Sequence, residues 1–146
     1  MVQQILVCDD EPHVVRAISL KFTRSGFDVK GASDVESCWR LLNHHELPAL
    51  LIVDDSMPPG PGGTELIRRI RSDVRFNDLP IIMLTAKAFE MSEEVELLTT
   101  LDVAQIIAKP FSPRVLLANV CRMLGHEAVL QTSSYGREFD RQTVTA

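Results

Sequence analysis

The feature that most constrains the fold is a series of short apolar runs, too short for helices and too apolar for strands with one solvent-exposed face. Longer segments separate these runs, and in them apolar residues recur three or four positions apart, as on one face of a helix. Strands that are apolar along most of their length are typical of a parallel sheet covered by helices on both faces. This alternation predicts an α/β fold. The runs occupy residues 5–8, 49–53, 81–84 and 105–108.

A further strand is expected at residues 27–30, where apolar and polar residues alternate as in a half-exposed edge strand. Gly26 ends the helical segment before it. The chain then contains five consecutive strand–helix units, and right-handed crossovers place their helices on both sides of the sheet. We therefore predict a flavodoxin-like, doubly wound (βα)₅ fold with a five-stranded parallel sheet of order 2-1-3-4-5. This order puts the half-exposed strand at an edge and the topological switch point between the first and third strands.

The helices are placed by their start signals. Pro12 suits the first turn of a helix, and Ser112 followed by Pro113 is typical of a capped start. Ser92, followed by acidic residues, marks the start of the fourth helix, because acids stabilise the positive end of a helix dipole. The Pro/Gly-rich stretch 58–63 is expected to be a loop. Helices are thus predicted at residues 12–25, from 34, at 64–72, from 92 and from 112.

The length of 146 residues fits a single domain with a short extension. The strand–helix pattern stops at about Gly125, so the domain is expected to cover residues 1–125. Residues 126–146 are rich in Thr, Ser, Gln and charged residues. We expect this segment to be a flexible tail or a truncated linker.

Charge and hydropathy limit the partners. The formal net charge is −5 and the sequence has no basic run, which argues against direct binding to nucleic acid or to a membrane surface. No apolar stretch reaches the roughly 18 residues that a membrane span needs. The N-terminus lacks the basic start of a signal peptide. A cytoplasmic location is expected.

The three cysteines, Cys8, Cys38 and Cys121, are far apart and odd in number, and their spacing matches no metal-binding pattern. They lie in apolar or helical stretches. We therefore expect buried free thiols in a reducing compartment.

Polar residues stand at the ends of four predicted strands. Asp9 and Asp10 follow the first strand, Asp54 follows the third, Thr85 the fourth and Lys109 the fifth. Ligands of open α/β sheets bind beyond the carboxyl ends of the strands, near the switch point. These side chains are therefore predicted to gather at one edge of the sheet.

This set of side chains suits phosphoryl transfer. Three carboxylates at adjacent strand ends repel one another, and a divalent cation such as Mg²⁺ relieves the repulsion through oxygen ligands. The cation would also neutralise an incoming phosphoryl group, and a carboxylate can attack as the nucleophile to become an aspartyl phosphate. Lys109 would supply a positive charge and Thr85 a hydrogen bond to the same group.

Four short segments resemble the signature segments of response regulator receiver domains. Each is a weak signal alone, but the four occur in the family's order at the ends of the first, third, fourth and fifth predicted strands. The resemblance covers about residues 3–124. It implies a receiver of a two-component phosphorelay that catalyses its own phosphorylation and dephosphorylation and has no separate enzymatic activity. The segments are residues 5–12 (ILVCDDEP), 54–58 (DDSMP), 84–87 (LTAK) and 109–111 (KPF).

The resemblance also implies roles for particular residues. Asp54 would accept the phosphoryl group from a histidine kinase or a histidine phosphotransfer protein. Mg²⁺, or Mn²⁺ in its place, would be bound by Asp10, Asp54 and the backbone carbonyl of Ser56, with Asp9 helping through water.

Thr85 and Lys109 would hold the phosphoryl group, and the peptide bond between Lys109 and Pro110 would be cis.

The chain departs from the family pattern at three places that bear on signal output. Ile106 stands where the family has Tyr or Phe. The loop of residues 59–63 is one residue longer than usual. Asp102 stands where the family usually has Gly, and Asp tolerates a left-handed backbone better than most residues do.

The output surface is expected at the fourth helix, fifth strand and fifth helix. Phosphorylation should rearrange residues 86–100, and the same surface would support a homodimer. In such a dimer the acids within residues 93–96 could face Arg114 or Arg122 of a second chain.

Other function classes fit the same residues less well. A phosphatase of the aspartyl-phosphate type would need a D-x-D pair and a cap domain, and a flavodoxin would need a hydroxyl-rich phosphate loop where acids stand here. A phosphorylation-independent pseudo-receiver, acting as a protein-binding module, is the alternative. The output stays open between a stand-alone regulator, a phosphorelay carrier and a receiver cut from a larger protein.

Overall fold

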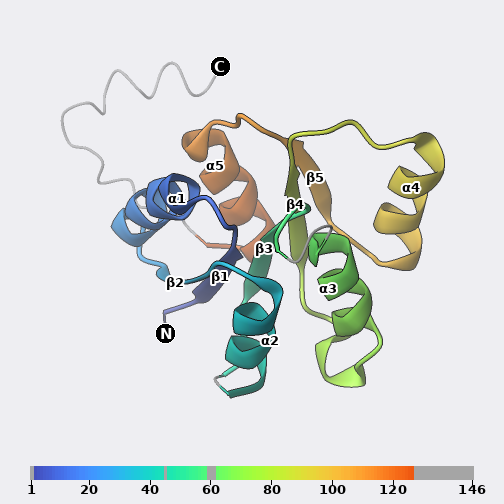
Figure 1. The fold of residues 1–146 in the computed structure, drawn as a ribbon. Coiled ribbons are helices and arrows are strands. Elements are labelled where there is room, and N and C mark those ends of the chain that lie inside the picture. Colours follow the sequence, from blue (N-terminus) through green and yellow to red (C-terminus); the bar gives the residue numbers. More distant parts are fainter. Residues whose placement is uncertain (1, 45, 59–61, 127–146) are drawn as a thin grey trace.

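The computed structural model describes residues 2–44, 46–58 and 62–126. Its centre is a five-stranded parallel sheet of order β2-β1-β3-β4-β5 (Figure 1). The predicted fold class and strand order are therefore confirmed. The strands are β1 (Gln4–Cys8), β2 (Asp28–Ala32), β3 (Leu50–Asp54), β4 (Ile81–Thr85) and β5 (Gln105–Ala108).

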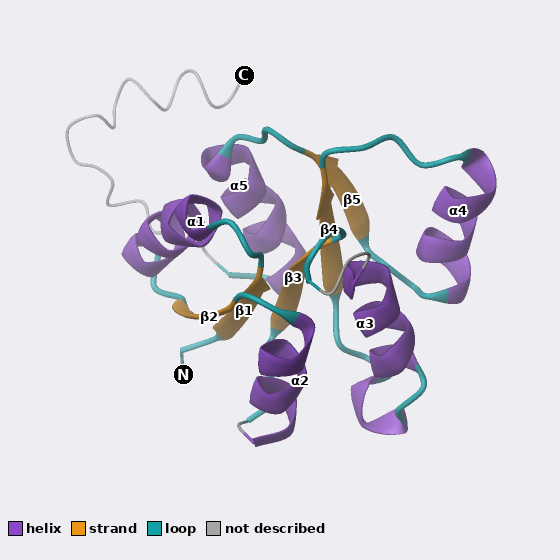
Figure 2. Ribbon diagram, viewed as in Figure 1, coloured by secondary structure: helices purple, strands orange, loops and turns teal. Residues whose placement is uncertain are grey.

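Helices cover both faces of the sheet (Figure 2). Two of them, α1 and α5, pack on one face, and α2, α3 and the turn that continues α4 pack on the other. None of the described helices combines the length and the apolar character that crossing a membrane requires. The helices are α1 (Pro12–Arg24), α2 (Val35–His44), α3 (Gly62–Arg71), α4 (Met91–Val95) and α5 (Pro113–Leu124), with a 3₁₀ turn η1 (Val74–Phe76) and a π-helical turn η2 (Glu96–Thr100).

The central strand β3 explains why the apolar runs carry so much information. Leu50 and Ile52 pack with α1 and α5, whereas Leu51 and Val53 pack with α2 and α3. All four side chains are fully buried, so both faces of the strand are covered before it reaches Asp54. The strand β2 pairs only with β1 and leaves most of its residues partly exposed, which confirms its prediction as an edge.

The starts of two helices follow their caps. The Ser112 hydroxyl accepts a hydrogen bond of 3.2 Å from a backbone N–H of the first turn of α5, as predicted. Helix α4 begins at Met91, one residue before the predicted Ser92. The reason is that Glu90 takes the capping position, where its N–H donates to the Glu93 carboxylate at 3.2 Å.

Helix α3 begins earlier than predicted, inside the Pro/Gly-rich stretch that was expected to be a loop. Gly62 and Gly63 form its first turn. A Cβ atom on Gly63 would lie 2.1 Å from the backbone oxygen of Asp54 and 2.6 Å from the Cα of Asp55. The glycines are therefore there to let the helix start directly against the loop that follows β3, and not to break the helix.

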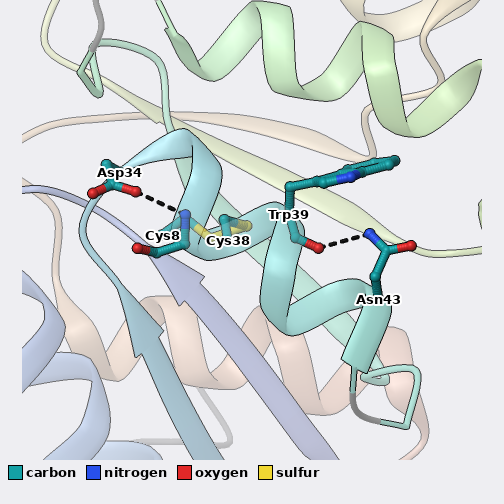
Figure 3. The surroundings of a disulfide bond; sticks show 6 residues. Cys8, Asp34, Cys38, Trp39 and Asn43 are labelled. Carbon is teal, nitrogen blue, oxygen red and sulfur yellow. Dashed lines mark hydrogen bonds between the residues drawn. A yellow bond between two sulfur atoms is a disulfide. The ribbon is translucent and has the colours of Figure 1, made fainter.

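The prediction of free thiols is wrong for two of the three cysteines. Cys8, at the end of β1, and Cys38, in α2, are joined by a disulfide with a Cα–Cα distance of 6.2 Å (Figure 3). The residues are 30 positions apart, and only the strand–helix crossover brings them together. Cys121 is a buried free thiol, as predicted.

Asp102 occupies a left-handed turn with a φ of 53°, the conformation for which the family usually has Gly. The turn is held by Arg71 at the end of α3. Its guanidinium donates to the carbonyl oxygens of Asp102 at 3.1 Å, Leu101 at 2.8 Å and Leu79 at 2.7 Å. Arg71 thus fixes the turn that leads into β5.

The tail predicted from residue 126 lies, apart from His126, outside the described residues, as do residues 59–61 of the longer loop. The His126 ring stacks on Phe27 with a centroid distance of 4.0 Å. Its Nε2 lies 2.8 Å from the carbonyl oxygen of Ser25. The end of α5 is therefore packed against the turn between α1 and β2.

Candidate functional site

Three carboxylates meet at the carboxyl end of the sheet. Asp9 and Asp10 directly follow β1, and Asp54 is the last residue of the neighbouring strand β3. An oxygen from each of the three lies within 4.8 Å of the others. Asp9 and Asp54 are buried and Asp10 is exposed, so the cluster opens to solvent on the side of Asp10. Such a set of oxygen ligands fits a hard divalent cation.

Asp9 shows the electrostatic cost of this arrangement. Its Oδ1 accepts a hydrogen bond of 2.9 Å from the Glu11 N–H. Its Oδ2 has no hydrogen-bond partner among the described residues, although Lys109 Nζ forms an ion pair with it at 2.9 Å. Burial raises the pKa of the Asp9 carboxyl, and the nearby charge of Asp54 adds to this, while the Glu11 N–H and Lys109 oppose it. Lys109 and the Glu11 N–H thus offset the burial of this carboxylate only in part, and a further cation would favour its charged form.

Asp54 lies between the acids and the lysine. Its side chain is almost fully buried. Its Oδ1 lies 3.3 Å from Lys109 Nζ, and its Oδ2 accepts a hydrogen bond of 3.3 Å from the Ser56 hydroxyl. The carboxylate is therefore oriented by one contact on each oxygen.

Lys109 follows β5 and is joined to Pro110 by a cis peptide bond, as the resemblance implied. Its ammonium contacts the carboxylate of Glu11 at 2.7 Å as well as those of Asp9 and Asp54. Burial alone would lower the pKa of Lys109, but the hydrogen bonds to Glu11 and Asp9 and the charge of Asp54 outweigh it and raise the pKa. The lysine thus keeps its positive charge at neutral pH.

Thr85, at the end of β4, is buried beside this cluster. Its hydroxyl accepts a hydrogen bond from the Lys87 N–H at 3.1 Å and lies 3.2 Å from the Lys87 carbonyl oxygen. Burial raises the pKa of the neighbouring Asp55 carboxyl, the Thr85 side chain opposes this, and the charge of Asp54 adds to it. The backbone of Lys87 therefore holds the Thr85 hydroxyl in this structure.

The structure brings the predicted site residues Asp9, Asp10, Asp54 and Lys109 into one cluster, with Thr85 and Ser56 at its sides. Two residues of the site are absent from the sequence prediction. The ion pair of Glu11 with Lys109 joins residues 98 positions apart. Asp55 is buried next to Asp54. The run of acids at 9–11 is the signal that indicates Glu11, whereas the sequence offers no signal for Asp55.

A cavity of about 420 Å³ lies next to this cluster. Glu11 and Lys109 form one part of its lining, and Ala86 and Phe111 contribute apolar surface. The remaining lining comes mainly from α1, including His13. The lysine can therefore be reached from solvent between α1 and the loop after β5.

Glu96, one of the acids predicted to face a second chain, has a partner within its own chain. It accepts two hydrogen bonds, at 2.6 and 3.1 Å, from the Arg68 guanidinium. This pair joins η2 to α3, and an arginine of a second copy would have to compete with it.

Sequence relatives indicate the family of the chain. The family model described as response regulator receiver domain matches residues 5–121. The chain is 35% identical over 125 residues to a chemotaxis protein CheY homolog of Campylobacter jejuni, covering 84% of this chain and 92% of that protein. It is 34% identical over 124 residues to the response regulator Rre1 of a Synechocystis species, again over 84% of this chain. It spans only 52% of the length of that relative.

Solved structures give the same fold. A response regulator receiver protein from Pseudomonas putida superposes with a TM-score of 0.75 at 30% identity, covering 84% of this chain and 98% of that one. The chemotaxis response regulator CheY4 of Vibrio cholerae gives a TM-score of 0.74 at 23% identity, covering 85% of this chain and all of that one, and it supports the fold alone. With the family model matching most of the described residues, the chain belongs to the response regulator receiver domain family.

Proposed function

We propose that this receiver is a phosphorylation switch in which Asp54 accepts a phosphoryl group from a cytoplasmic histidine kinase or histidine phosphotransfer protein. The observation that carries the proposal is the position of Asp54. Its buried carboxylate stands 3.3 Å from a lysine ammonium and within the cluster of three acids. A nucleophile, a positive charge and a set of cation ligands are the parts that phosphoryl transfer needs.

In the proposed reaction, one carboxylate oxygen of Asp54 attacks the phosphorus of a phosphohistidine. The new bond is an acyl phosphate, and the P–N bond breaks so that the imidazole leaves with the bonding electrons. Lys109 balances the charge of the phosphoryl oxygens from the side of Oδ1. The Ser56 hydroxyl holds Oδ2, which restricts rotation of the carboxylate during the attack.

The metal requirement follows from the charge of the site. We assign the ligands to Asp10, Asp54 and the backbone carbonyl of Ser56, with Asp9 acting through water. Mg²⁺ bound there, or Mn²⁺ in its place, would neutralise part of the phosphoryl charge. The three carboxylates, which offer oxygens within 4.8 Å of one another, support this assignment.

The switch is assigned to Thr85. To reach the phosphoryl oxygens, its hydroxyl must leave the backbone of Lys87, and the loop that leads into α4 must adjust. We propose that α4, β5 and α5 form the surface that responds and binds the partner or a second copy. Exposed apolar side chains there, such as Met91, Val95 and Val115, support this location.

The test is treatment of the chain with acetyl phosphate, with and without Mg²⁺, followed by intact mass measurement. We expect one phosphoryl group per chain, and only with the metal present. Asp54→Asn should abolish the modification. Full labelling of that variant, or equal labelling in excess chelator, would contradict the proposal. Complete absence of labelling in the unmodified chain would instead support the phosphorylation-independent binding module.

A further inference from the structure

The disulfide between Cys8 and Cys38 lies next to the acid cluster. Cys8 is the last residue of β1 and immediately precedes Asp9. Figure 3 shows the bond reaching from the end of this strand to α2. Both cysteine side chains are fully buried. One end of the bond is therefore covalently adjacent to a proposed metal-binding residue.

The other end of the bond is linked to the loop that follows Asp54. At the start of α2, the Val35 N–H donates to the Pro58 carbonyl oxygen at 3.2 Å. The Val35 side chain also lies against the first residue of α3, since a Cβ atom on Gly62 would come within 2.5 Å of it. Helix α2 is thus in contact with the segment that carries Ser56. The disulfide therefore joins the strand that precedes Asp9 to the helix that contacts the loop after Asp54.

We propose that Cys8 and Cys38 form a reversible redox site that tunes cation binding by the acid cluster. The effect on the cation rests on the proposed function, whereas the thiol chemistry does not. Reversibility is argued from the proposed cytoplasmic partners, because disulfides in that compartment are usually transient. The oxidised state ties α2 to β1, and the reduced state leaves this contact to packing alone.

The reaction partner is a low-molecular-weight thiol and its disulfide. In oxidation, the thiolate of one cysteine attacks the small disulfide and releases one thiol. The second cysteine then attacks the mixed disulfide and releases the other thiol. Two protein thiols lose two electrons, and one small disulfide becomes two thiols. Because both sulfur atoms are buried, exchange requires α2 to open, and it should be slow in the folded chain.

Thiol counting tests the first half of the proposal. The full chain is equilibrated in mixtures of reduced and oxidised glutathione, quenched with acid, denatured, alkylated and weighed. We expect one alkylated thiol, Cys121, under oxidising mixtures and three under reducing ones. Cys121→Ala should give no alkylated thiol under oxidising mixtures and two under reducing ones. Cys38→Ala should give two alkylated thiols in every mixture.

Two results would overturn this half. Three alkylated thiols in every mixture would mean that no bond forms, and one in every mixture would mean that the bond does not exchange. Trp39, the single tryptophan, follows Cys38 in α2 and supplies an independent fluorescence signal of the transition. It packs edge-on to Phe76 at 5.9 Å, so opening of α2 should change its emission.

Cation titration tests the second half. Mn²⁺ binding is followed by the loss of the free-ion signal in electron paramagnetic resonance, for the oxidised and the reduced chain. We expect several-fold weaker binding after reduction, and Cys38→Ala should behave as the reduced chain in both mixtures. Equal affinities in the two states would refute the coupling. Asp54→Asn should keep its thiol counts, so loss of phosphorylation and loss of redox chemistry are separable.

Discussion

At the scale of single residues, Lys109 is held by three carboxylates, those of Asp9, Glu11 and Asp54. Its ammonium has three donors, so an incoming phosphoryl oxygen must displace one of these contacts. Asp9 and Asp54 are buried, whereas the Glu11 side chain is 47% exposed and water can solvate it once it is released. Glu11 is therefore the contact that we expect to give way.

Glu11→Gln should speed phosphorylation of Asp54. Lys109 holds the pKa of Glu11 below its usual range, so the glutamate is charged at neutral pH and competes with phosphate for the lysine. Glutamine keeps the size and removes the charge. We expect the rate of labelling by acetyl phosphate to rise several-fold.

Lys109→Ala is the matched control for Glu11→Gln, because it removes the group for which glutamate and phosphate compete. Glu11→Gln should leave the rate unchanged in that background. An unchanged or slower rate for Glu11→Gln in the otherwise unmodified chain would show that Glu11 does not restrain the lysine.

Asp9 should make the metal-free chain less stable as the pH rises. A carboxyl whose pKa is raised on folding favours the folded state below its ordinary value of 3.8, and this contribution is lost as the pH rises through the raised pKa. Each pKa unit corresponds to about 1.4 kcal/mol. Compared with Asp9→Asn, the unmodified chain should lose stability as the pH rises from 3.8 through the raised pKa of Asp9.

The measurement for Asp9 is urea unfolding of both proteins in chelator across that pH range. The difference in unfolding free energy removes the contributions of all other titrating groups. Asp10→Asn serves as the control, since this exposed residue should show little of the effect. A pH-independent difference for Asp9→Asn would refute the role of burial. Added Mg²⁺ should restore stability to the unmodified chain at neutral pH.

At the scale of the elements, the strands were predictable because both faces of a central strand are buried. Successive residues such as Leu51 and Ile52 are therefore apolar. The start of α3 was not, since Gly62 and Gly63 have the same composition as a loop. Only the structure shows why glycine is needed there, because it places the backbone oxygen of Asp54 where a Cβ atom on Gly63 would lie. The disulfide of Cys8 escaped prediction for the same reason, because nothing in a spacing of 30 residues indicates contact.

Gly63→Ala should damage both the fold and the site. The new methyl group would meet the backbone of Asp54 and Asp55, which cannot rotate away as a side chain can. Overpacking of this kind costs about 1–3 kcal/mol. Because the displaced backbone carries the acceptor, phosphorylation should also slow.

Gly31→Ala in β2 is the comparison for this variant. Its methyl group would lie 2.8 Å from the Val15 side chain, which can change rotamer, so the loss should be smaller. Urea unfolding measures both variants, and acetyl phosphate labelling follows the acceptor. Equal losses in the two variants, or normal labelling of Gly63→Ala, would contradict the close packing of α3 on the site.

At the scale of the whole molecule, the site was predictable from topology. Parallel strands bring Asp9, Asp54, Thr85 and Lys109 to one edge whatever the details of packing. The finer contacts were not predictable, because they depend on side-chain directions over a few ångströms. The ion pair between Glu11 and Lys109 is of this kind. So is the link from Arg68 to Glu96, which determines what α4 can offer to a partner.

Helix α4 has the connections of an element that responds to the site. The loop before it supplies the Lys87 backbone that holds Thr85. The turn after it is tied to α3 by Arg68 and Glu96, whose side chains are 46% and 38% exposed, a pair worth about 1 kcal/mol or less. Ile106 packs against the core below, where the family has an aromatic ring. Because the ion pair between Arg68 and Glu96 is weak, α4 can move when Thr85 moves.

We therefore predict that phosphorylation rearranges residues 86–100 even without an aromatic residue at position 106. When the Thr85 hydroxyl turns to the phosphoryl oxygens, Lys87 loses its hydrogen bond and the loop into α4 must shift. Beryllofluoride should speed amide exchange in residues 86–100. The same addition to Asp54→Asn should leave the exchange rates unchanged. Changes confined to the loop after β3, with Ile106→Tyr restoring a response in α4, would instead identify a phosphoryl carrier that has lost its conformational output.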